Sequence, residues 1–166
     1  MSAITVVPLG EYLSTVYRPD REYVDGQLLE RNLGEWDHAR LQGLLYGFLL
    51  KHEKEWKILV VPEQRVQVKP TRFRVPDITV LTGPAPVDIV RTPPFLCIEI
   101  LSPDDRIKEM QTRIDDYLEF GVSYVWLIDP ATRRATVYTR DGVSEVRDGI
   151  LATRNPDIRV ILGELD

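Results

Sequence analysis

The stretch Phe95-Leu-Cys-Ile-Glu-Ile-Leu101 predicts a buried β-strand that carries a single charged residue, Glu99. A second apolar stretch, Arg74-Val-Pro-Asp-Ile-Thr-Val80, carries Asp77 in similar surroundings. An ionised carboxylate left unpaired in an apolar strand costs several kcal/mol, so a metal ion, a cationic side chain or a proton must compensate each acid. A metal ion or a cation would make the pair a functional site, and a proton would indicate a perturbed pKa.

The residues after Glu99 predict a helix and then a second buried strand. In Ser102-Pro-Asp-Asp105 the serine suits the N-cap, the proline the first helical position and the last acid the third, and we expect this helix to end at Gly121. Tyr124-Val-Trp-Leu-Ile-Asp129 is typical of another buried strand. A strand, helix, strand unit over residues 94–129 implies a right-handed crossover and a parallel strand pair.

The helix expected over 102–120 has an apolar face and a basic flank when its residues are placed at about 100° intervals. The apolar face comprises Ile107, Met110, Ile114, Tyr117 and Leu118. Arg106 and Arg113 fall together on one flank, from which Arg113 could reach the strand ends that hold the acids. A solvated flank with no further role is the alternative.

Outside this unit, hydrophobic periodicity and turn signals predict short elements within one continuous domain over residues 1–166. They are a helix over 9–18, a hairpin of 22–24 and 27–31 about Asp25-Gly26, a helix over 37–55 with Asp37 as its N-cap, strands over 56–61, 65–69 and 74–81, and a hairpin of 135–139 and 143–146 across Asp141-Gly142. We therefore expect an α/β (α+β) fold, in which helices flank a mixed β-sheet and β-hairpins are accessory to it.

Charge and cysteine content narrow the functional classes. The formal net charge of −5 over 166 residues argues against a protein that coats nucleic acid by bulk electrostatics. The single cysteine, Cys97, lies in an apolar strand and forms no internal disulfide, which suits a buried residue in a reducing cytosol. The N-terminus lacks a basic leader region, and no apolar run approaches the roughly 18 residues that span a bilayer, so a cytoplasmic location is expected.

Four cations precede Asp77 closely in the sequence. Arg65, Lys69, Arg72 and Arg74 lie on a predicted strand and loop that lead to the acid, where they could track the phosphates of a nucleic acid. A solvated hairpin face is the alternative, because short charge runs are usually exposed. The chain shows no helix-turn-helix, zinc cluster, P-loop or glycine-rich dinucleotide turn that would read bases or bind nucleotides.

The two acids suit a hard divalent cation. Carboxylates that converge from adjacent strands form the kind of oxygen site that Mg²⁺ prefers, with waters completing the octahedron. The structural alternative is that Asp77 caps a turn after Pro76 while Glu99 pairs with an arginine in the sheet. Spacing alone leaves both interpretations open.

The sequence resembles the Uma-two family of restriction-endonuclease-like proteins, part of the PD-(D/E)XK nuclease superfamily, over nearly the whole chain. The motifs that carry the resemblance are Glu22-Tyr-Val-Asp-Gly26, His38 at the start of the long helix, Val75-Pro-Asp-Ile78, Ile98-Glu-Ile-Leu-Ser-Pro103 with Asp105-Arg106, Tyr117-Leu-Glu-Phe-Gly-Val122 and Tyr124-Val-Trp-Leu-Ile-Asp-Pro130.

This resemblance implies a restriction-endonuclease-like core with a metal-dependent phosphodiesterase site. Asp77 and Glu99 would hold Mg²⁺ or Mn²⁺, and Ile100 would add its backbone carbonyl. Glu22 matches the position of a possible third acid, and His38 that of a group lining the site. For His38 the alternative is a residue that bonds the backbone at the start of its helix.

The sequence departs from the superfamily pattern at the catalytic lysine. Leu101 stands two residues after the second acid, where the superfamily has lysine, and Arg113 stands four residues before Tyr117, where the Uma-two pattern commonly places its lysine. A guanidinium clamps phosphate but does not readily release a proton, which excludes a general base and leaves electrostatic stabilisation.

Three functional interpretations follow. The leading one is a Mg²⁺-dependent nuclease acting on DNA, with Arg113 as the charge stabiliser. The second is a catalytically inactive relative that serves as a DNA-binding or protein-interaction module. The third is a stress or mobile-element protein whose acids are structural. A homodimer is the expected oligomeric state.

Overall fold

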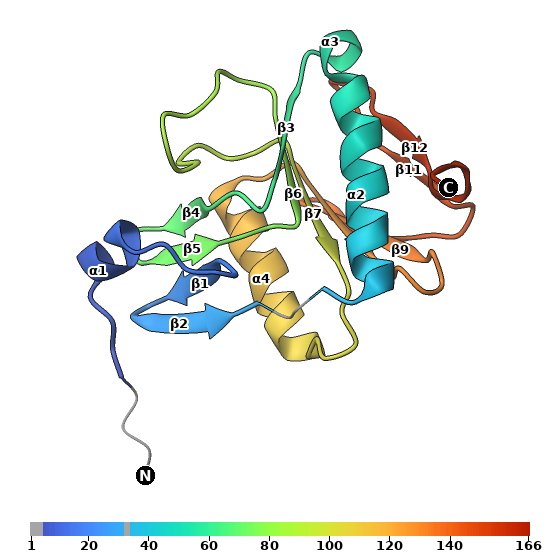
Figure 1. Ribbon diagram of the computed structural model, residues 1–166. Coiled ribbons are helices and arrows are strands. Elements are labelled where there is room, and N and C mark those ends of the chain that lie inside the picture. The colour runs from blue at the N-terminus through green and yellow to red at the C-terminus, as the bar shows by residue number, and fades with distance from the viewer. Residues whose placement is uncertain (1–4, 32–33) are drawn as a thin grey trace.

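The computed structural model describes residues 5–31 and 34–166 (Figure 1). The helices are α1 (Leu9–Ser14), α2 (Trp36–Lys51), α3 (Glu53–Trp56), α4 (Ile107–Phe120) and the short 3₁₀ helix η1 (Leu162–Glu164). The strands are β1 (Arg21–Val24), β2 (Gln27–Glu30), β3 (Leu59–Pro62), β4 (Val66–Lys69), β5 (Arg72–Arg74), β6 (Ile78–Leu81), β7 (Leu96–Ile100), β8 (Tyr124–Ile128), β9 (Ala135–Thr139), β10 (Gly142–Val146), β11 (Ile150–Ala152) and β12 (Arg159–Ile161).

The described strands form a six-stranded mixed sheet in the order β10-β9-β8-β7-β6-β3, a four-stranded sheet in the order β2-β1-β5-β4, and the pair β11-β12. β7 and β8 run parallel, with Glu99 beside Leu127, and α4 connects them. The other neighbours in the six-stranded sheet are antiparallel. The predicted mixed sheet with flanking helices and the predicted parallel pair are therefore confirmed.

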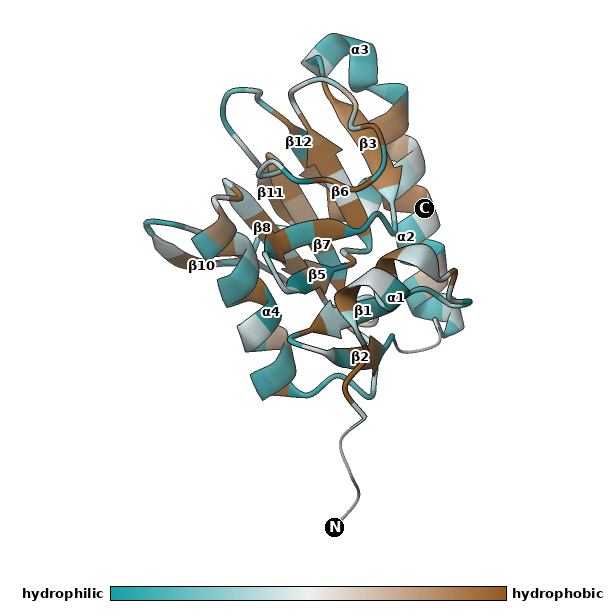
Figure 2. Ribbon diagram, turned by 90° about the vertical axis from the view of Figure 1, so that its left-hand side faces the viewer, coloured by the Kyte–Doolittle hydropathy of each residue, from teal (hydrophilic) through white to brown (hydrophobic). Residues whose placement is uncertain are grey.

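The two faces of the six-stranded sheet pack against different helices, α2 on one side and α4 on the other (Figure 1). In β7, Leu96, Ile98 and Ile100 join the core that contains α2, whereas Cys97 joins the core that contains α4. This alternation follows from the two-residue period of a strand, and it places Glu99 on the α4 face. In Figure 2 the strands of this sheet are mostly hydrophobic, whereas the visible face of α4 is mostly hydrophilic.

The four-stranded sheet begins with the predicted hairpin. β1 and β2 pair around Asp25 and Gly26, whose φ angles are 48° and 93°. A two-residue turn needs positive φ at both positions for its twist to match that of the two strands. A Cβ at Gly26 would also lie 2.7 Å from Cγ1 of Val6. Tyr12, Tyr23 and Phe73 form a small buried aromatic cluster beside this sheet.

The predicted strand over 74–81 is two strands in two different sheets. β5 ends at Arg74 in the four-stranded sheet, and β6 starts at Ile78 in the six-stranded sheet. Pro76, which lies between them, has no N–H to donate to a ladder. Asp77 therefore lies where the chain passes from one sheet to the other.

The helix predicted over 37–55 differs from the observed helix α2 at both ends. α2 begins at Trp36 with Glu35 at the cap position, so Asp37 lies in the first turn and is not the N-cap. The helix is interrupted at His52, whose Nδ1 lies 2.7 Å from the carbonyl oxygen of Phe48, and the chain continues as α3.

The predicted start of the last long helix at Ser102 is also wrong. Ser102 and Asp105 close a turn of their own, in which the Ser102 N–H donates to Asp105 Oδ2 at 2.7 Å, and α4 begins only at Ile107. Ile107 is 91 % exposed, so it does not belong to the apolar face as expected. Because it is the first helical residue, the buried stripe starts one turn later, at Met110. Gly121, with φ 110°, ends the helix as predicted.

Within the described ranges, no helix has both the length and the apolar character needed to cross a bilayer. Cys97 is buried and free, as the sequence indicated.

Two glycine substitutions test this account of the backbone. Gly26→Ala should lower the free energy of unfolding by more than about 1 kcal/mol, because alanine resists positive φ and its Cβ would meet Val6. Gly43→Ala, on an exposed position inside α2 with no atom within 4 Å of the added Cβ, should raise it by about 1 kcal/mol. Urea unfolding measures both, and a destabilising Gly43→Ala would contradict the α2 assignment.

Candidate active site

Asp77 is 3 % exposed and every oxygen of its carboxylate has a partner. Oδ2 accepts a hydrogen bond from the Ile100 N–H at 2.7 Å, and Oδ1 accepts one from Arg31 Nη2 at 2.7 Å. His38 Nε2 lies 3.3 Å from Oδ2. The bond to Ile100 joins the start of β6 to the end of β7, and so brings Asp77 next to Glu99.

Glu99 is 2 % exposed and contacts the α4 side of the sheet. Its Oε1 accepts a hydrogen bond from the Tyr117 hydroxyl at 2.6 Å, and Arg113 Nη1 lies 3.4 Å from Oε2. Burial raises the pKa of Glu99 to about 7, with help from the nearby charges of Asp77 and Glu22 and against the opposing effect of Arg113. Burial of Glu99 thus outweighs the effect of the positive charge that Arg113 places beside it.

Glu22 lies behind Arg113. Its Oε1 accepts the Val75 N–H at 3.0 Å and lies 3.3 Å from Arg113 Nε, while its Oε2 accepts Arg74 Nη1 at 2.9 Å. Glu99 and Glu22 together raise the pKa of Arg113 although burial works against this. Glu22 thus holds the guanidinium against Glu99 and does not line the cavity in front of the acids.

A polar cavity of ≈ 70 Å³ opens in front of Asp77 and Glu99. Its lining comprises Glu30, Arg31, His38, Asp77, Glu99, Ile100, Ser102, Asp104, Asp105, Glu109 and Arg113. The structure thus brings together Asp77, Glu99, Ile100, His38 and Arg113 from the residues singled out in the sequence.

Arg31 is the cation of the site that sequence reasoning missed. It follows β2 directly, and its Nη1 also lies 3.5 Å from Glu63 Oε1. No periodicity marks it, because it meets Asp77 only through tertiary packing. Asp104 and Glu109 were not singled out either, although both line the cavity.

His38 is poised to donate a hydrogen bond. Its hydrogen bond with Asp77 raises the pKa of the imidazole, and burial lowers it to a lesser degree. Its Nδ1 has no hydrogen-bond partner within the described residues. The side chain lines the polar cavity and makes no hydrogen bond to the backbone among the described residues.

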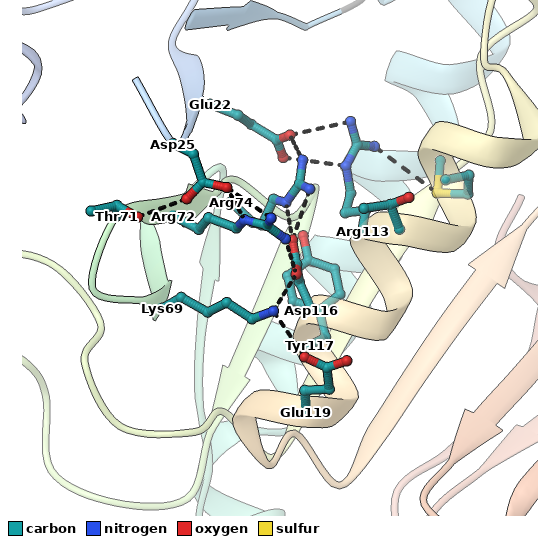
Figure 3. A network of polar contacts seen from close by, with 12 residues as sticks. Glu22, Asp25, Lys69, Thr71, Arg72, Arg74, Arg113, Asp116, Tyr117 and Glu119 are labelled. Atoms are coloured by element: carbon teal, nitrogen blue, oxygen red, sulfur yellow. Dashed lines mark hydrogen bonds and ion pairs between the residues drawn. The ribbon is translucent and has the colours of Figure 1, made fainter. Parts of the chain in front are cut away.

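The four cations expected to track phosphates are engaged in ion pairs. Arg74 is buried between Glu22 and Asp116, so it does not lie on an exposed face as expected (Figure 3). Arg72 Nη1 donates to Asp116 Oδ1 at 2.9 Å, and Lys69 Nζ lies 2.9 Å from Glu119 Oε2.

Arg65 Nη2 donates to Asp20 Oδ1 at 2.6 Å. A phosphate contact by Arg65, Lys69 or Arg72 stays a prediction. Any such contact would have to compete with the ion pairs that these side chains make.

Asp116 links the four-stranded sheet to α4. Its carboxylate, which is 2 % exposed, accepts hydrogen bonds from Arg72 and Arg74 of β5. Arg74 also forms an ion pair with Glu22, and Glu22 forms one with Arg113, which lies one helical turn before Asp116 on α4. Figure 3 shows this chain of alternating charges, which runs from β1 and β5 to α4.

The donor set fits a divalent cation that keeps most of its waters. Among residues 5–31 and 34–166, no three His, Cys, Asp or Glu side chains gather as a metal site. A metal would therefore rest on Asp77 and Glu99, which is the number of carboxylates that Mg²⁺ usually takes from a protein. Both carboxylates are buried and line the same polar cavity, so a cation bound there would also offset the cost of burying their charge.

Comparison with known proteins shows a nuclease-like fold. A family model named Uma2, described as "Putative restriction endonuclease", matches residues 12–161. A crystal structure described as a "putative nuclease belonging to DUF820", from Anabaena variabilis ATCC 29413, superposes with a TM-score of 0.81 at 23 % identity and covers 96 % of this chain and 97 % of that one. None of the curated proteins compared with the chain matches it.

Removing Asp116 should test the charge chain. We expect Asp116→Ala to lower the free energy of unfolding by about 3 to 5 kcal/mol, because it leaves Arg74 buried without one of its two carboxylate partners. Glu119→Ala, which removes only the exposed partner of Lys69, should cost less than about 1 kcal/mol. Urea unfolding compares the two, and equal effects would contradict a special role for Asp116.

The pKa of Glu99 predicts how the metal-free protein responds to pH. Because the folded-state pKa of about 7 exceeds the ordinary 4.5, the folded protein binds more protons than the unfolded chain between these values, and its stability should fall as pH rises through them. The full effect of this one group is about 3 kcal/mol.

Glu99→Gln should flatten that slope in urea unfolding from pH 4.5 to 8 with a chelator present. The matched control is the exposed Glu55→Gln, which should keep the slope of the wild type. An unchanged slope in Glu99→Gln would show that Glu99 titrates normally.

Proposed function

From the fact that the chain belongs to the Uma2 family, described as "Putative restriction endonuclease", we propose that it is a nuclease that hydrolyses phosphodiester bonds with a divalent cation held by Asp77 and Glu99. One observation carries the proposal. Two buried carboxylates from adjoining strands meet at one small polar cavity that also receives two arginines. A cavity with paired acids and fixed cations suits a phosphate group and a metal ion together.

Asp77, Glu99 and the carbonyl of Ile100 would hold Mg²⁺ or Mn²⁺. When bound, such an ion supplies Lewis-acid stabilisation and makes bound water more acidic. Arg31 and Arg113, which now contact the two carboxylates, would then be available to bind the oxygens of the scissile phosphate.

The protein groups supply charge and hydrogen bonds. Arg113 stabilises the charge that develops on the phosphate and, as a guanidinium, does not accept the proton of the attacking water. His38, whose pKa is raised by Asp77, donates a hydrogen bond to an oxygen of the substrate. No lysine is among the residues that line the cavity, and Leu101 lines the two neighbouring cavities.

The second candidate function is a catalytically inactive module that binds DNA or protein. The observation in its favour is that Arg31 already neutralises Asp77 at 2.7 Å. In that case the arginines are permanent structural partners of the acids, and the substitutions at positions 101 and 113 record lost catalysis. Metal binding separates the two candidates.

The remaining parts of the proposal concern the setting of the reaction. We propose DNA as the nucleic acid, the cytoplasm as the compartment and a homodimer as the oligomeric state. The reducing cytoplasm agrees with a free, buried Cys97. Light scattering on the purified chain decides the oligomeric state.

Cleavage and metal binding test the proposal together. With millimolar Mn²⁺ or Mg²⁺ we expect cleavage of single-stranded or duplex DNA, and Asp77→Ala should lower the rate by at least about 100-fold because it removes a metal ligand. The matched control is Asp115→Asn, an exposed acid on α4, which should leave the rate unchanged. Electron paramagnetic resonance of Mn²⁺ measures binding independently of cleavage.

The outcomes divide the candidates clearly. Absence of Mn²⁺ binding by the wild type would overturn the metal site, and binding without cleavage would favour the inactive module. In that second case Arg113→Lys should create activity if Asp77 and Glu99 are still poised, because lysine restores the family's usual group at this position.

A further inference from the structure

An apolar groove of ≈ 250 Å³ lies beside the polar cavity. It runs between the first turns of α4 and the strands β8 and β9, and its apolar walls comprise Leu101, Ile107, Met110, Ile114, Leu127 and Tyr138. Met110 and Ile114 belong to the buried core under α4, with Leu127 and Tyr138 packed against them. The groove therefore lies where the hydrophobic core under α4 reaches the surface of the protein.

Ile107 extends the apolar surface beyond the core. It is 91 % exposed at the start of α4, so nothing in the described chain covers it. Contiguous exposed apolar surface with polar groups at its rim is typical of a ligand site. The polar groups here are Ser102, Asp105, Arg106 and Gln111.

The groove is continuous with the candidate active site. Ser102 and Asp105 line both the groove and the polar cavity that contains Asp77 and Glu99. A ligand that occupies the groove would therefore extend from it toward the two acids. The groove has the size and position of a subsite and not of a separate pocket.

We propose that this groove binds the base of a nucleotide adjacent to the phosphate that Asp77 and Glu99 act on; the inference rests on the proposed nuclease function. A nucleobase combines flat apolar faces with a polar edge. The ring of Tyr138 and the side chain of Ile107 suit the faces, and the polar rim suits the edge.

Charge favours this kind of recognition over phosphate contacts. The chain has a net charge of −5, and the four cations that closely precede Asp77, namely Arg65, Lys69, Arg72 and Arg74, are held in ion pairs. Stacking on a base contributes to affinity without counterion release and tolerates any sequence. Because a base in a duplex is stacked and paired, the substrate class is nucleic acid with unpaired bases.

The test compares two oligonucleotides that share a backbone. A labelled thymidine hexamer and a hexamer of the same phosphodiester backbone without bases are titrated with the full chain in EDTA, and fluorescence anisotropy measures both dissociation constants. We expect the wild type to bind the hexamer with bases about ten-fold more tightly. A blunt duplex carrying the same thymidine tract should bind no better than the hexamer without bases.

Two variants locate that preference in the groove. Tyr138→Leu and Ile107→Ala should each reduce it to about three-fold or less while leaving binding of the hexamer without bases unchanged. Ile107 is almost fully exposed, so its variant is expected to fold even if Tyr138→Leu does not. The matched control is Val87→Ala, an exposed apolar residue between β6 and β7 that does not line the groove, which should keep the ten-fold preference.

Equal binding of the two hexamers by the wild type would overturn the proposal, and so would a ten-fold preference that survives Ile107→Ala. Tight binding of the duplex would overturn its restriction to unpaired bases. A base preference in a protein that never cleaves DNA would refute the nuclease function and leave the base site standing as part of a binding module. Cleavage of DNA without any base preference would refute the base site and leave the nuclease function standing.

Discussion

Pairing of buried charges is the constraint on which the rest of the structure depends. Asp77, Glu99, Glu22 and Asp116 are each at most 3 % exposed, and unpaired carboxylates in such places would cost several kcal/mol each. Arg31, Arg113 and Arg74 supply the opposite charges from different elements of the chain. The strand ends, the four-stranded sheet and α4 must therefore keep their relative positions for these acids to keep their ion-pair partners.

The passage of the chain between two sheets at Pro76 makes this arrangement possible. It puts Arg74 in the sheet that carries Glu22, and Asp77 at the edge of the sheet that carries Glu99. The four-stranded sheet is thus more than an accessory hairpin, because it supplies the groups that orient Arg113 from behind. Arg113 in turn contacts Glu99, so the chemistry of the site depends on a sheet that contributes Glu30, at the end of β2, to the lining of the cavity.

The same network explains why the site is incompletely neutralised at Glu99. Tyr117 donates a short hydrogen bond to one oxygen, whereas Arg113 stands farther from the other and is shared with Glu22. A buried carboxylate in this condition either takes up a proton or accepts a cation. The geometry thus combines a structural salt-bridge network with a site that a divalent ion would stabilise.

The sequence by itself determined the local elements, the two acids and the parallel unit around α4. Periodicity and turn residues are short-range signals, so the hairpin at Asp25-Gly26, the strand of Glu99 and the helix end at Gly121 were all predictable. The first residues of helices were less predictable. At Ser102, for example, the backbone N–H donates to Asp105 within a local turn that does not continue into the helix. Pro76 was present in the sequence as a signal, but periodicity alone did not show that it divides two sheets.

Only the tertiary structure decided that Arg31 meets Asp77 and that Glu22 contacts Arg113, whereas helical spacing had already placed Arg113 on the flank from which it could reach the acids. Arg31 and Asp77 are 46 residues apart, and Glu22 and Arg113 are 91 apart, distances over which no local pattern relates two side chains. The alternative in which Glu99 pairs with an arginine is realised through α4, not through the sheet. The two acids were predictable from the sequence because a charged residue stands out in an apolar strand. Their cationic partners lie in segments whose sequence is typical of a surface. These segments become buried only when the whole molecule folds, so the local sequence does not show it.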